Sequence, residues 1–223
     1  MRKSGGFLVN AAAYSGKGIG FANAGFLNKV RGEKLRIAII GSGAMGMLFG
    51  GYLSKENKVV LIDIDKSKVE KINQDGIRIN EPDGNIIAAC PEAAISGARL
   101  GHMDLVILFV KAMNSRLALE RNRQLIGPDT YVLSLQNGAG HDAVIKDFVA
   151  EDKIVIGTTQ HNSSIIEPGV IRHGGGGKTF IGLMHGDGTE LKSIVETFNR
   201  CGFETEISGK IQRKIWEKLF YIC

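Results

Sequence analysis

The chain has 223 residues, of which 28 are lysine or arginine, 23 are aspartate or glutamate, and 43% are hydrophobic. This is the composition of an ordinary globular protein, and no apolar run reaches the roughly 18 residues that a membrane-spanning helix needs. The three cysteines lie far apart and form no CxxC pair, which argues against a disulfide framework or a structural zinc site. We therefore expect a cytoplasmic protein with no membrane partner.

The net positive charge belongs to the N-terminal segment. Residues 1–34 hold six basic residues and one acidic residue, whereas the rest of the chain holds 22 of each. The segment is rich in glycine and follows no sustained period, so we expect a poorly ordered extension, with a targeting peptide as the alternative. Its charge also raises the hypothesis of a nucleic-acid-binding protein, but such a domain needs its own basic face. The neutral body therefore predicts no nucleic-acid partner.

From Leu35 onward, apolar strands alternate with helices. In chain order the patterns predict a strand over 35–40, a helix over 44–55, a strand over 58–62, a helix over 66–74, strands over 77–80, 85–90 and 104–110, a helix over 114–126, a strand over 131–135, a helix over 141–149, strands over 153–160, 169–173 and 178–184, a helix over 189–201, a strand over 204–207 and a helix over 210–223. We expect two antiparallel pairs, one around the Pro-Asp-Gly turn and one around the glycine run 174–177.

This alternation predicts an α/β fold with a Rossmann-type doubly wound, mostly parallel sheet and an added antiparallel portion. We expect a dinucleotide-binding domain over 35–208, and in 209–223 only the first helix of a second, all-helical domain. Six apolar residues predict that this helix is buried nearly all round: Ile211, Ile215, Trp216, Leu219, Phe220 and Ile222. No stop signal follows it, so we expect either a fragment or a partner from another chain.

The segment Gly41–Gly46, GSGAMG, matches G-x-G-x-x-G where that pattern is informative, because it follows a buried strand and opens a helix. The first glycine permits the turn, the second lets a pyrophosphate approach the backbone, and the third lets the helix pack on the sheet. The expected cofactor-binding residues of this loop are Gly41, Ser42, Gly43, Ala44, Met45 and Gly46. The alternative is a glycine turn that only joins strand to helix.

Asp63 ends the second strand about twenty residues after the first glycine, which is the usual place for the carboxylate that binds the ribose hydroxyls. A carboxylate there repels a 2′-phosphate and favours NAD(H), whereas Lys66 and Lys68 just beyond it are placed to bind that phosphate. An alternative role for Asp63 is to cap the following helix.

Two further side chains directly follow strands. Lys111 comes after LVILFV, and Asn137 comes soon after YVLSL. Ligands of open α/β sheets bind outside the carboxyl ends of the strands, so both residues are expected to border one crevice. The alternatives are a surface lysine and a turn asparagine. His161 and His173 are further candidates for the rim of that crevice.

Five strings in order, GSGAMG, FVKAMN, LQNGAG, GTTQH and KIWEKL, resemble those of 2-dehydropantoate 2-reductase, also called ketopantoate reductase. The resemblance runs from about Leu35 to Cys223. It implies NADPH-dependent reduction of 2-dehydropantoate to pantoate, on the route to pantothenate and coenzyme A. It covers the nucleotide-binding domain and only the first helix of the family's second domain.

By this resemblance, Lys111 and Asn137 would line the cofactor and substrate cleft, Ser163 would lie near a backbone contact to the cofactor, and Lys218 would be the catalytic lysine. Two departures stand out. Ile222 occupies the position of a substrate-binding asparagine, and the helical domain that supplies further substrate-binding residues is absent. The family's NADP(H) also conflicts with Asp63, which makes NAD(H) plausible.

Lys218 shares a helix face with Lys210 and Lys214. A lysine beside the ketone oxygen supplies both charge and proton during hydride transfer, and desolvation with repulsion along the row would lower the pKa of Lys218. The alternative is a solvated basic stripe.

The expected substrate is a small 2-oxo acid, and no metal is expected because no histidine spacing suits one. The glycine run before Lys178 lacks phosphate-loop spacing and is expected to join two strands. The alternatives are a reductase of a different 2-oxo acid and a non-catalytic NAD(P)-binding module. The oligomeric state is open, with a homodimer as one option.

Overall fold

The computed structural model describes residues 34–186 and 188–222, with side chains described as far as Phe220. The predicted extension over 1–34 lies outside the described residues, apart from Lys34. The helices are α2 (Ala44–Leu53), α3 (Lys66–Asp75), α4 (Ser115–Arg121), α5 (Asp142–Ile145), α6 (Lys192–Arg200) and α7 (Ile211–Ile222). The strands are β1 (Arg36–Ile40), β2 (Lys58–Ile62), β3 (Ile77–Asn80), β4 (Ile86–Ala89), β5 (Glu92–Ala94), β6 (Leu105–Leu108), β7 (Tyr131–Ser134), β8 (Ile154–Thr159), β9 (Asn162–Glu167), β10 (Val170–Gly175), β11 (Thr179–Leu183) and β12 (Thr205–Ile207).

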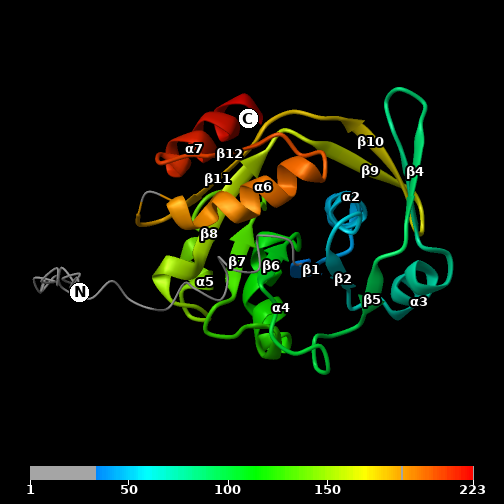
Figure 1. Ribbon diagram of the computed structural model, residues 1–223, viewed down its shortest axis with the longest axis horizontal. Coiled ribbons are helices and arrows are strands. Elements are labelled where there is room, and N and C mark those ends of the chain that lie inside the picture. The colour runs from blue at the N-terminus through cyan, green and yellow to red at the C-terminus, as the bar shows by residue number, and fades with distance from the viewer. Residues whose placement is uncertain (1–33, 187, 223) are drawn as a thin grey trace, which may run out of the picture.

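These strands form two sheets (Figure 1). The first has eight strands in the order β12-β11-β8-β7-β6-β1-β2-β5, and only the β8 and β11 pair is antiparallel. The second has four strands in the order β4-β3-β10-β9, with β3 and β10 parallel and the outer pairs antiparallel. The predicted α/β fold, mostly parallel with an antiparallel portion, is confirmed.

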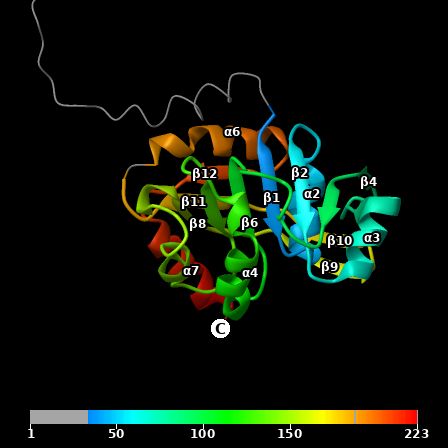
Figure 2. The same ribbon diagram turned by 90° about the horizontal axis from the view of Figure 1, so that it is seen from below.

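The first sheet has helices on both faces, which is what its nearly continuous apolar strands require. One core packs β1, β6 and β7 against α2 and α6, and the other packs the opposite strand faces against α4, α5 and α7. Figure 2 shows α6 on one side of the strands and α4 and α7 on the other. The sheet is therefore doubly wound, and its loops are free to build a site at the strand ends.

Helix α2 is buried along most of its length because it lies between the two sheets. A Cβ added at Gly50 would lie 2.6 Å from the Leu61 side chain of the first sheet. A Cβ added at Gly51 would lie 2.7 Å from the Ile79 side chain of the second sheet. Two adjacent glycines thus let one helix approach both sheets closely.

The helix predicted over 114–126 ends earlier, at Arg121. The side-chain amide of the next residue, Asn122, donates to the Ala118 carbonyl at 2.8 Å and its oxygen accepts from the Gly97 amide at 2.7 Å. Asparagine side chains compete in this way with helical backbone hydrogen bonds, and a short 3-10 turn follows over 123–125.

The predicted antiparallel pairing of 169–173 with 178–184 is wrong. These segments form β10 and β11, which belong to different sheets, so the glycine run between them carries the chain from one sheet to the other. Their antiparallel partners are β9 and β8, respectively. Strand β9 has no counterpart in the prediction because it is mostly exposed and its sequence, NSSIIE, shows no alternation.

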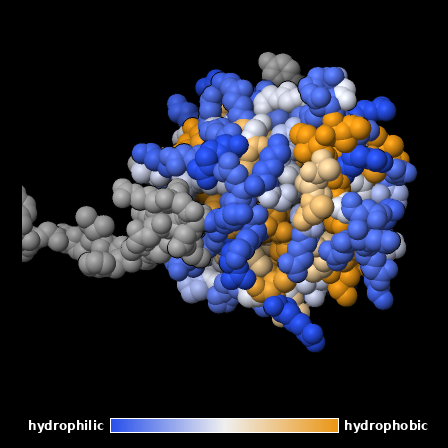
Figure 3. All heavy atoms as spheres, turned by 45° about the vertical axis from the view of Figure 1, so that its right-hand side comes forward, coloured by the Kyte–Doolittle hydropathy of each residue, from blue (hydrophilic) through white to orange (hydrophobic). Residues whose placement is uncertain are grey.

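Helix α7 is not buried nearly all round, as the sequence predicts. Ile211 and Ile215 are buried in the core that α7 shares with β8 and β11, whereas Trp216 is 52% and Phe220 82% exposed. The helix thus buries one face only. Exposed apolar residues also occur on the second sheet, at Ile165 and Ile86. On the side of the molecule that carries this sheet, apolar side chains gather in patches between polar ones (Figure 3).

Candidate functional site

The chain reverses direction across the first sheet between β1 and β6, because the strands after β1 lie on one side and β6 returns to the other. Ligands of doubly wound sheets bind at such a switch point, outside the carboxyl ends of the strands. Two cavities lie at this edge and share Val110 as a lining residue. We call them the Lys218 cavity, of about 630 Å³, and the Asp63 cavity, of about 520 Å³.

The glycine loop lies between these cavities, since Gly41 lines the Asp63 cavity and Met45 lines the Lys218 cavity. Gly41 has a φ of +103°, which favours glycine, and a Cβ on it would lie 3.0 Å from the backbone of Phe109. A Cβ on Gly46 would lie 1.9 Å from the Gly41 carbonyl oxygen. Both positions therefore require glycine for packing, as the sequence predicts for a turn and a close helix.

The second glycine has a different role. A Cβ on Gly43 would meet nothing within 4 Å, so this part of the loop faces open space. Gly43 is also the N-cap of α2 and gives its first amides no side-chain acceptor. Free amides at the positive end of a helix, beside an open glycine, fit a pyrophosphate. The residues present therefore fit a dinucleotide.

Asp63 holds the glycine loop in place. Its Oδ2 accepts hydrogen bonds from the Ser42 amide at 3.0 Å, the Ser42 hydroxyl at 2.8 Å and Lys68 Nζ at 2.9 Å. Burial by itself would raise the pKa of Asp63, but the hydrogen bonds from Lys68, the Asp65 backbone and Ser42 outweigh it and lower the pKa. Asp63 thus stays ionised beside the cofactor loop.

The alternative role of Asp63 as a helix cap is wrong, because Asp65 caps α3 by accepting from the Lys68 amide at 3.2 Å. The two lysines suggested for a 2′-phosphate also differ. Lys68 Nζ is bound to Asp63, whereas Lys66 lines the Asp63 cavity and is 3.8 Å from Glu70.

Apolar side chains complete the Asp63 cavity. Ile64, Ile95 and Leu117 line it and are 77%, 55% and 48% exposed. Exposed isoleucines and leucines on three separate segments suit the flat face of an adenine ring. None of the three is among the site residues predicted from the sequence. Only Ile64 could be suspected from the sequence, because it directly follows Asp63. Ile95 and Leu117 are brought to the cavity by the fold.

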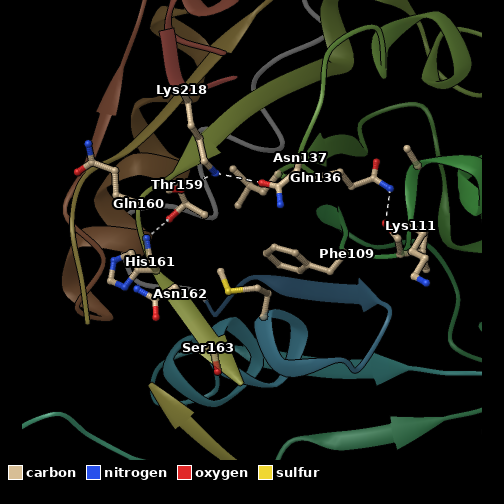
Figure 4. Close-up of a pocket in the computed structure, with 14 residues that line it drawn as sticks. Phe109, Lys111, Gln136, Asn137, Thr159, Gln160, His161, Asn162, Ser163 and Lys218 are labelled. Atoms are coloured by element: carbon tan, nitrogen blue, oxygen red, sulfur yellow. Dashed lines mark hydrogen bonds between the residues drawn. The ribbon is translucent and has the colours of Figure 1, made fainter. Parts of the chain in front are cut away.

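The Lys218 cavity brings together six residues singled out in the sequence: Met45, Lys111, Asn137, His161, Ser163 and Lys218. In Figure 4 the Lys218 side chain descends from α7 and points toward Asn137. Phe109, Gln136, Thr159, Gln160 and Asn162 also line the cavity. Strand ends β6, β7 and β8 therefore contribute to one chamber.

The ammonium of Lys218 has two acceptors. Its Nζ donates to Asn137 Oδ1 at 3.1 Å and to the Thr159 carbonyl at 2.9 Å. Both acceptors are neutral, and burial lowers the pKa of Lys218. A lysine held this way is available to exchange a proton with a ligand in the cavity.

The expected repulsion along the lysine row is wrong. Lys214 Nζ lies 3.2 Å from Glu217 and 5.1 Å from the centroid of the Phe180 ring. Its charge therefore interacts with Glu217 of α7 and with Phe180 of β11. Burial of Lys218, and not the charge of Lys214, lowers the pKa of Lys218. The reading of the row as a solvated stripe does not hold for Lys218, which is partly buried and faces the cavity.

Gln136 is a site residue that the sequence analysis missed, although it precedes Asn137 directly. Its Nε2 donates to the Ser115 hydroxyl at 2.8 Å and to the Val110 carbonyl at 2.5 Å, and its Oε1 accepts from Ser134 at 2.9 Å. It therefore links the end of β7 to the end of β6 by hydrogen bonds and stabilises the part of the cavity lining between Lys111 and Asn137.

The part of the chain that the structure describes holds neither a cluster of metal-binding side chains nor a helix suited to a membrane. Over 34–186 and 188–222, no three histidine, cysteine, aspartate or glutamate side chains gather in a way that suits a metal ion. No helix in these same ranges is long and apolar enough to span a bilayer.

A sequence model described as ketopantoate reductase PanE/ApbA matches residues 37–186. The 2-dehydropantoate 2-reductase of Halobacterium salinarum is 35% identical over 188 residues, which is 83% of this chain and 61% of that protein. The enzyme of the same name from Pyrococcus horikoshii is 34% identical over 82% of this chain and 60% of its own length. The chain thus spans about 60% of these relatives.

Solved structures give the same result. The putative 2-dehydropantoate 2-reductase from Enterococcus faecalis has a TM-score of 0.76 at 28% identity, over 82% of this chain and 60% of that one. D-mandelate dehydrogenase, in a ternary structure with NADH and anilino(oxo)acetate, has a TM-score of 0.76 at 34% identity, over 82% of this chain and 59% of that one. The match of the family model, the relatives and the shared fold show that this chain belongs to the ketopantoate reductase family.

Proposed function

We propose that this chain binds a reduced nicotinamide dinucleotide across the carboxyl edge of the first sheet and reduces a 2-oxo acid, with 2-dehydropantoate as the first candidate. The observation that carries the proposal is the position of Lys218. Its ammonium is held by Asn137 and the Thr159 carbonyl in a cavity that adjoins the open glycine loop. A proton donor beside a dinucleotide site is the minimum that ketone reduction requires.

In this proposal the loop from Gly41 to Gly46 and the first amides of α2 hold the pyrophosphate. The adenosine end lies over Ile64 and Leu117, and the nicotinamide end enters the Lys218 cavity. When bound, the cofactor supplies the hydride. The remaining work belongs to side chains of the chain itself.

Lys218 stabilises the oxygen that gains negative charge and gives it a proton. Asn137 and the Thr159 carbonyl orient the ammonium and carry no charge. The ammonium therefore forms no ion pair with them that would make it a weaker acid. Lys111, at the exposed side of the same cavity, is placed to attract the substrate carboxylate.

We propose NADH as the preferred cofactor. The Asp63 carboxylate lines the Asp63 cavity and remains ionised, so it repels a 2′-phosphate. Lys68 partly neutralises it, so the preference is expected to be moderate. The NADH complex of D-mandelate dehydrogenase supports the same choice.

A second candidate substrate is an aryl-substituted 2-oxo acid. It is favoured by the likeness to D-mandelate dehydrogenase, whose structure holds anilino(oxo)acetate. The likeness to 2-dehydropantoate 2-reductase and the likeness to D-mandelate dehydrogenase both concern only the part of each relative that this chain covers. Both substrates test the same proton donor.

The test is the oxidation of NADH and NADPH by the purified chain with 2-dehydropantoate and with an aryl 2-oxo acid. The matched variants are Lys218→Ala and Lys214→Ala, one helical turn apart. We expect turnover that falls at least a hundredfold in K218A, in the range lost with a general acid, and is unchanged in K214A. Equal turnover by K218A would remove Lys218 from the reaction. NADH binding with no turnover on either acid would favour a non-catalytic module.

A further inference from the structure

A chain of buried hydrogen bonds lies behind the wall of the Lys218 cavity. The Tyr52 hydroxyl donates to Glu81 Oε1 at 2.8 Å, and Glu81 Oε2 lies 2.7 Å from His173 Nδ1. His173 Nε2 then lies 3.0 Å from His161 Nδ1. The side chains of Tyr52, His173 and His161 are each less than 10% exposed. This series links α2, the segment after β3, strand β10 and the wall itself.

The order of donors in this series is determined by Glu81. A carboxylate only accepts, so the Tyr52 hydroxyl and the His173 Nδ1–H both donate to it. Burial, followed by Glu81, raises the pKa of Tyr52, so its proton stays in place. When the His173 ring is neutral, its Nε2 is an acceptor, and His161 donates to it through Nδ1–H. Glu81 thereby selects the tautomer of both imidazoles.

The glycine run 174–177 supports the same wall from behind. A Cβ on Gly174 would lie 1.7 Å from Asn162 Oδ1, and one on Gly176 would lie 3.1 Å from His161 Cε1. A Cβ on Gly177 would lie 2.7 Å from the Gln160 side chain. Three glycines of a run that only joins two strands in the sequence analysis thus face three consecutive wall residues.

The wall is connected to the proton donor. The His161 amide donates to Thr159 Oγ1 at 3.3 Å, and the Thr159 carbonyl accepts from Lys218 Nζ at 2.9 Å. Here the chain leaves β8 in the first sheet and enters β9 in the second. Figure 4 shows this turn, with Thr159, Gln160, His161 and Asn162 side by side along the cavity.

We propose that Glu81, His173 and His161 are positioning residues, which lock the wall over 159–162 so that the Thr159 carbonyl holds Lys218 in its reactive direction. The glycine run 174–177 packs against wall residues 160–162 and helps to hold them in place. None of the three side chains is assigned contact with the reacting atoms. The inference rests on the proposed function for its kinetic part and on geometry alone for its structural part.

The test compares Glu81→Gln with Tyr52→Phe. Glutamine offers one acceptor and one donor, so it cannot accept from both Tyr52 and His173, and the tautomers of the two histidines change. Phenylalanine removes only the outermost hydrogen bond and leaves the Glu81 carboxylate on His173. Glu81→Asp keeps two acceptor oxygens and serves as the conservative rescue. Gly176→Ala pushes on His161 without altering any hydrogen-bonding group.

Two measurements are made on each folded variant: imidazole and lysine nitrogen resonances by NMR, and turnover of NADH. In E81Q and G176A we expect a shifted Lys218 Nζ resonance and about a tenfold lower kcat, with unchanged NADH affinity, because a small misplacement of a reacting group suffices for this. Y52F is expected to keep the wild-type Lys218 resonance and kcat, and E81D to recover most of both.

The proposal is overturned if E81Q changes the imidazole resonances but leaves Lys218 Nζ and kcat as in the wild type. It is equally overturned if Y52F and E81Q act alike through a lower melting temperature alone. If the wild-type chain shows no turnover, the proposed function fails, whereas the Lys218 resonance still decides whether the wall is locked to it.

Discussion

Lys218 donates a hydrogen bond to Asn137 Oδ1 at 3.1 Å, which joins two residues 81 positions apart in the sequence. Asn137 lies in the loop after β7, and Lys218 lies on α7, which packs against β8 and β11. Both residues line the Lys218 cavity. Burial lowers the pKa of Lys218 although two neutral oxygens accept hydrogen bonds from its ammonium, so the ammonium is a stronger acid than that of an exposed lysine.

The first prediction concerns the pH dependence of reduction. Burial lowers the pKa of Lys218 below the ordinary lysine value of 10.5, and only the protonated amine can act as the acid. The kcat for reduction should therefore fall as pH rises through a pKa below 10.5. A pH–rate profile measures it, and Lys218→Arg, which stays charged, should lower kcat and lose this limb. Persistence of the limb in Lys218→Ala would assign it to another group.

Two substitutions of Asn137 should move the pKa of Lys218 in opposite directions. Asn137→Asp places a carboxylate 3.1 Å from the ammonium and should raise the pKa of Lys218, because an opposite charge favours the protonated amine. Asn137→Ala removes an acceptor from the charged form and should lower the pKa. The descending limb of the pH–rate profile thus moves to higher pH in the first variant and to lower pH in the second. Movement in the same direction would contradict the hydrogen bond as the cause.

Asp63 provides a prediction about the cofactor. Asp63→Ser removes the charge that faces a 2′-phosphate and frees Lys68 to approach it. The ratio of NADPH to NADH affinity should rise about tenfold or more, which is about 1.4 kcal/mol. Fluorescence titration with both cofactors measures the ratio, and Asp75→Ser, at a carboxylate of α3 that does not line the cavity, is the control. A ratio that does not change in D63S would show that this cavity does not hold the ribose.

The buried histidine pair predicts how stability changes with pH. Burial, with the neighbouring His173, lowers the pKa of His161 below the ordinary value of 6.5, against the opposing effects of Glu81 and the Gly177 backbone. The unfolded chain therefore binds this proton more readily than the folded one, so the free energy of unfolding falls as pH drops through about 6.5. Urea unfolding at pH values on both sides of this point measures the loss. His161→Gln should reduce it, whereas His185→Gln, at an exposed histidine, should not.

The parts of the fold with a local signal could be predicted from the sequence. The unit β1, glycine loop, α2 and β2 follows from an apolar run, a turn that only glycines permit and a helix with apolar residues at regular spacing. The separate sheets and different partners of β10 and β11 could not be predicted in this way. Sheet membership depends on contacts between distant segments, and the exposed β9 carries no alternation to reveal it.

The site divides along the same line. Lys111, Asn137 and the loop were predicted because strand ends of a parallel sheet share one edge. The sequence predicts a lowered pKa for Lys218 from desolvation with added repulsion along a row of lysines; burial lowers it without that repulsion, and the burial depends on how α7 packs. The role of Gln136, which depends on a contact with Ser115, and the apolar lining at Ile95 and Leu117 had no sequence signal, since they depend on distances between segments.

The dinucleotide site at the glycine loop is the central element of the proposed function, and one binding titration tests it. NADH is titrated against the wild type, Gly43→Ala and Gly46→Ala, with thermal unfolding measured on the same samples. A Cβ on Gly43 has free space, so G43A should keep its melting temperature and lose NADH affinity at least tenfold. G46A should also lose stability, by about 1–3 kcal/mol, because its Cβ overlaps the Gly41 carbonyl. Wild-type NADH affinity in a folded G43A would contradict the central claim.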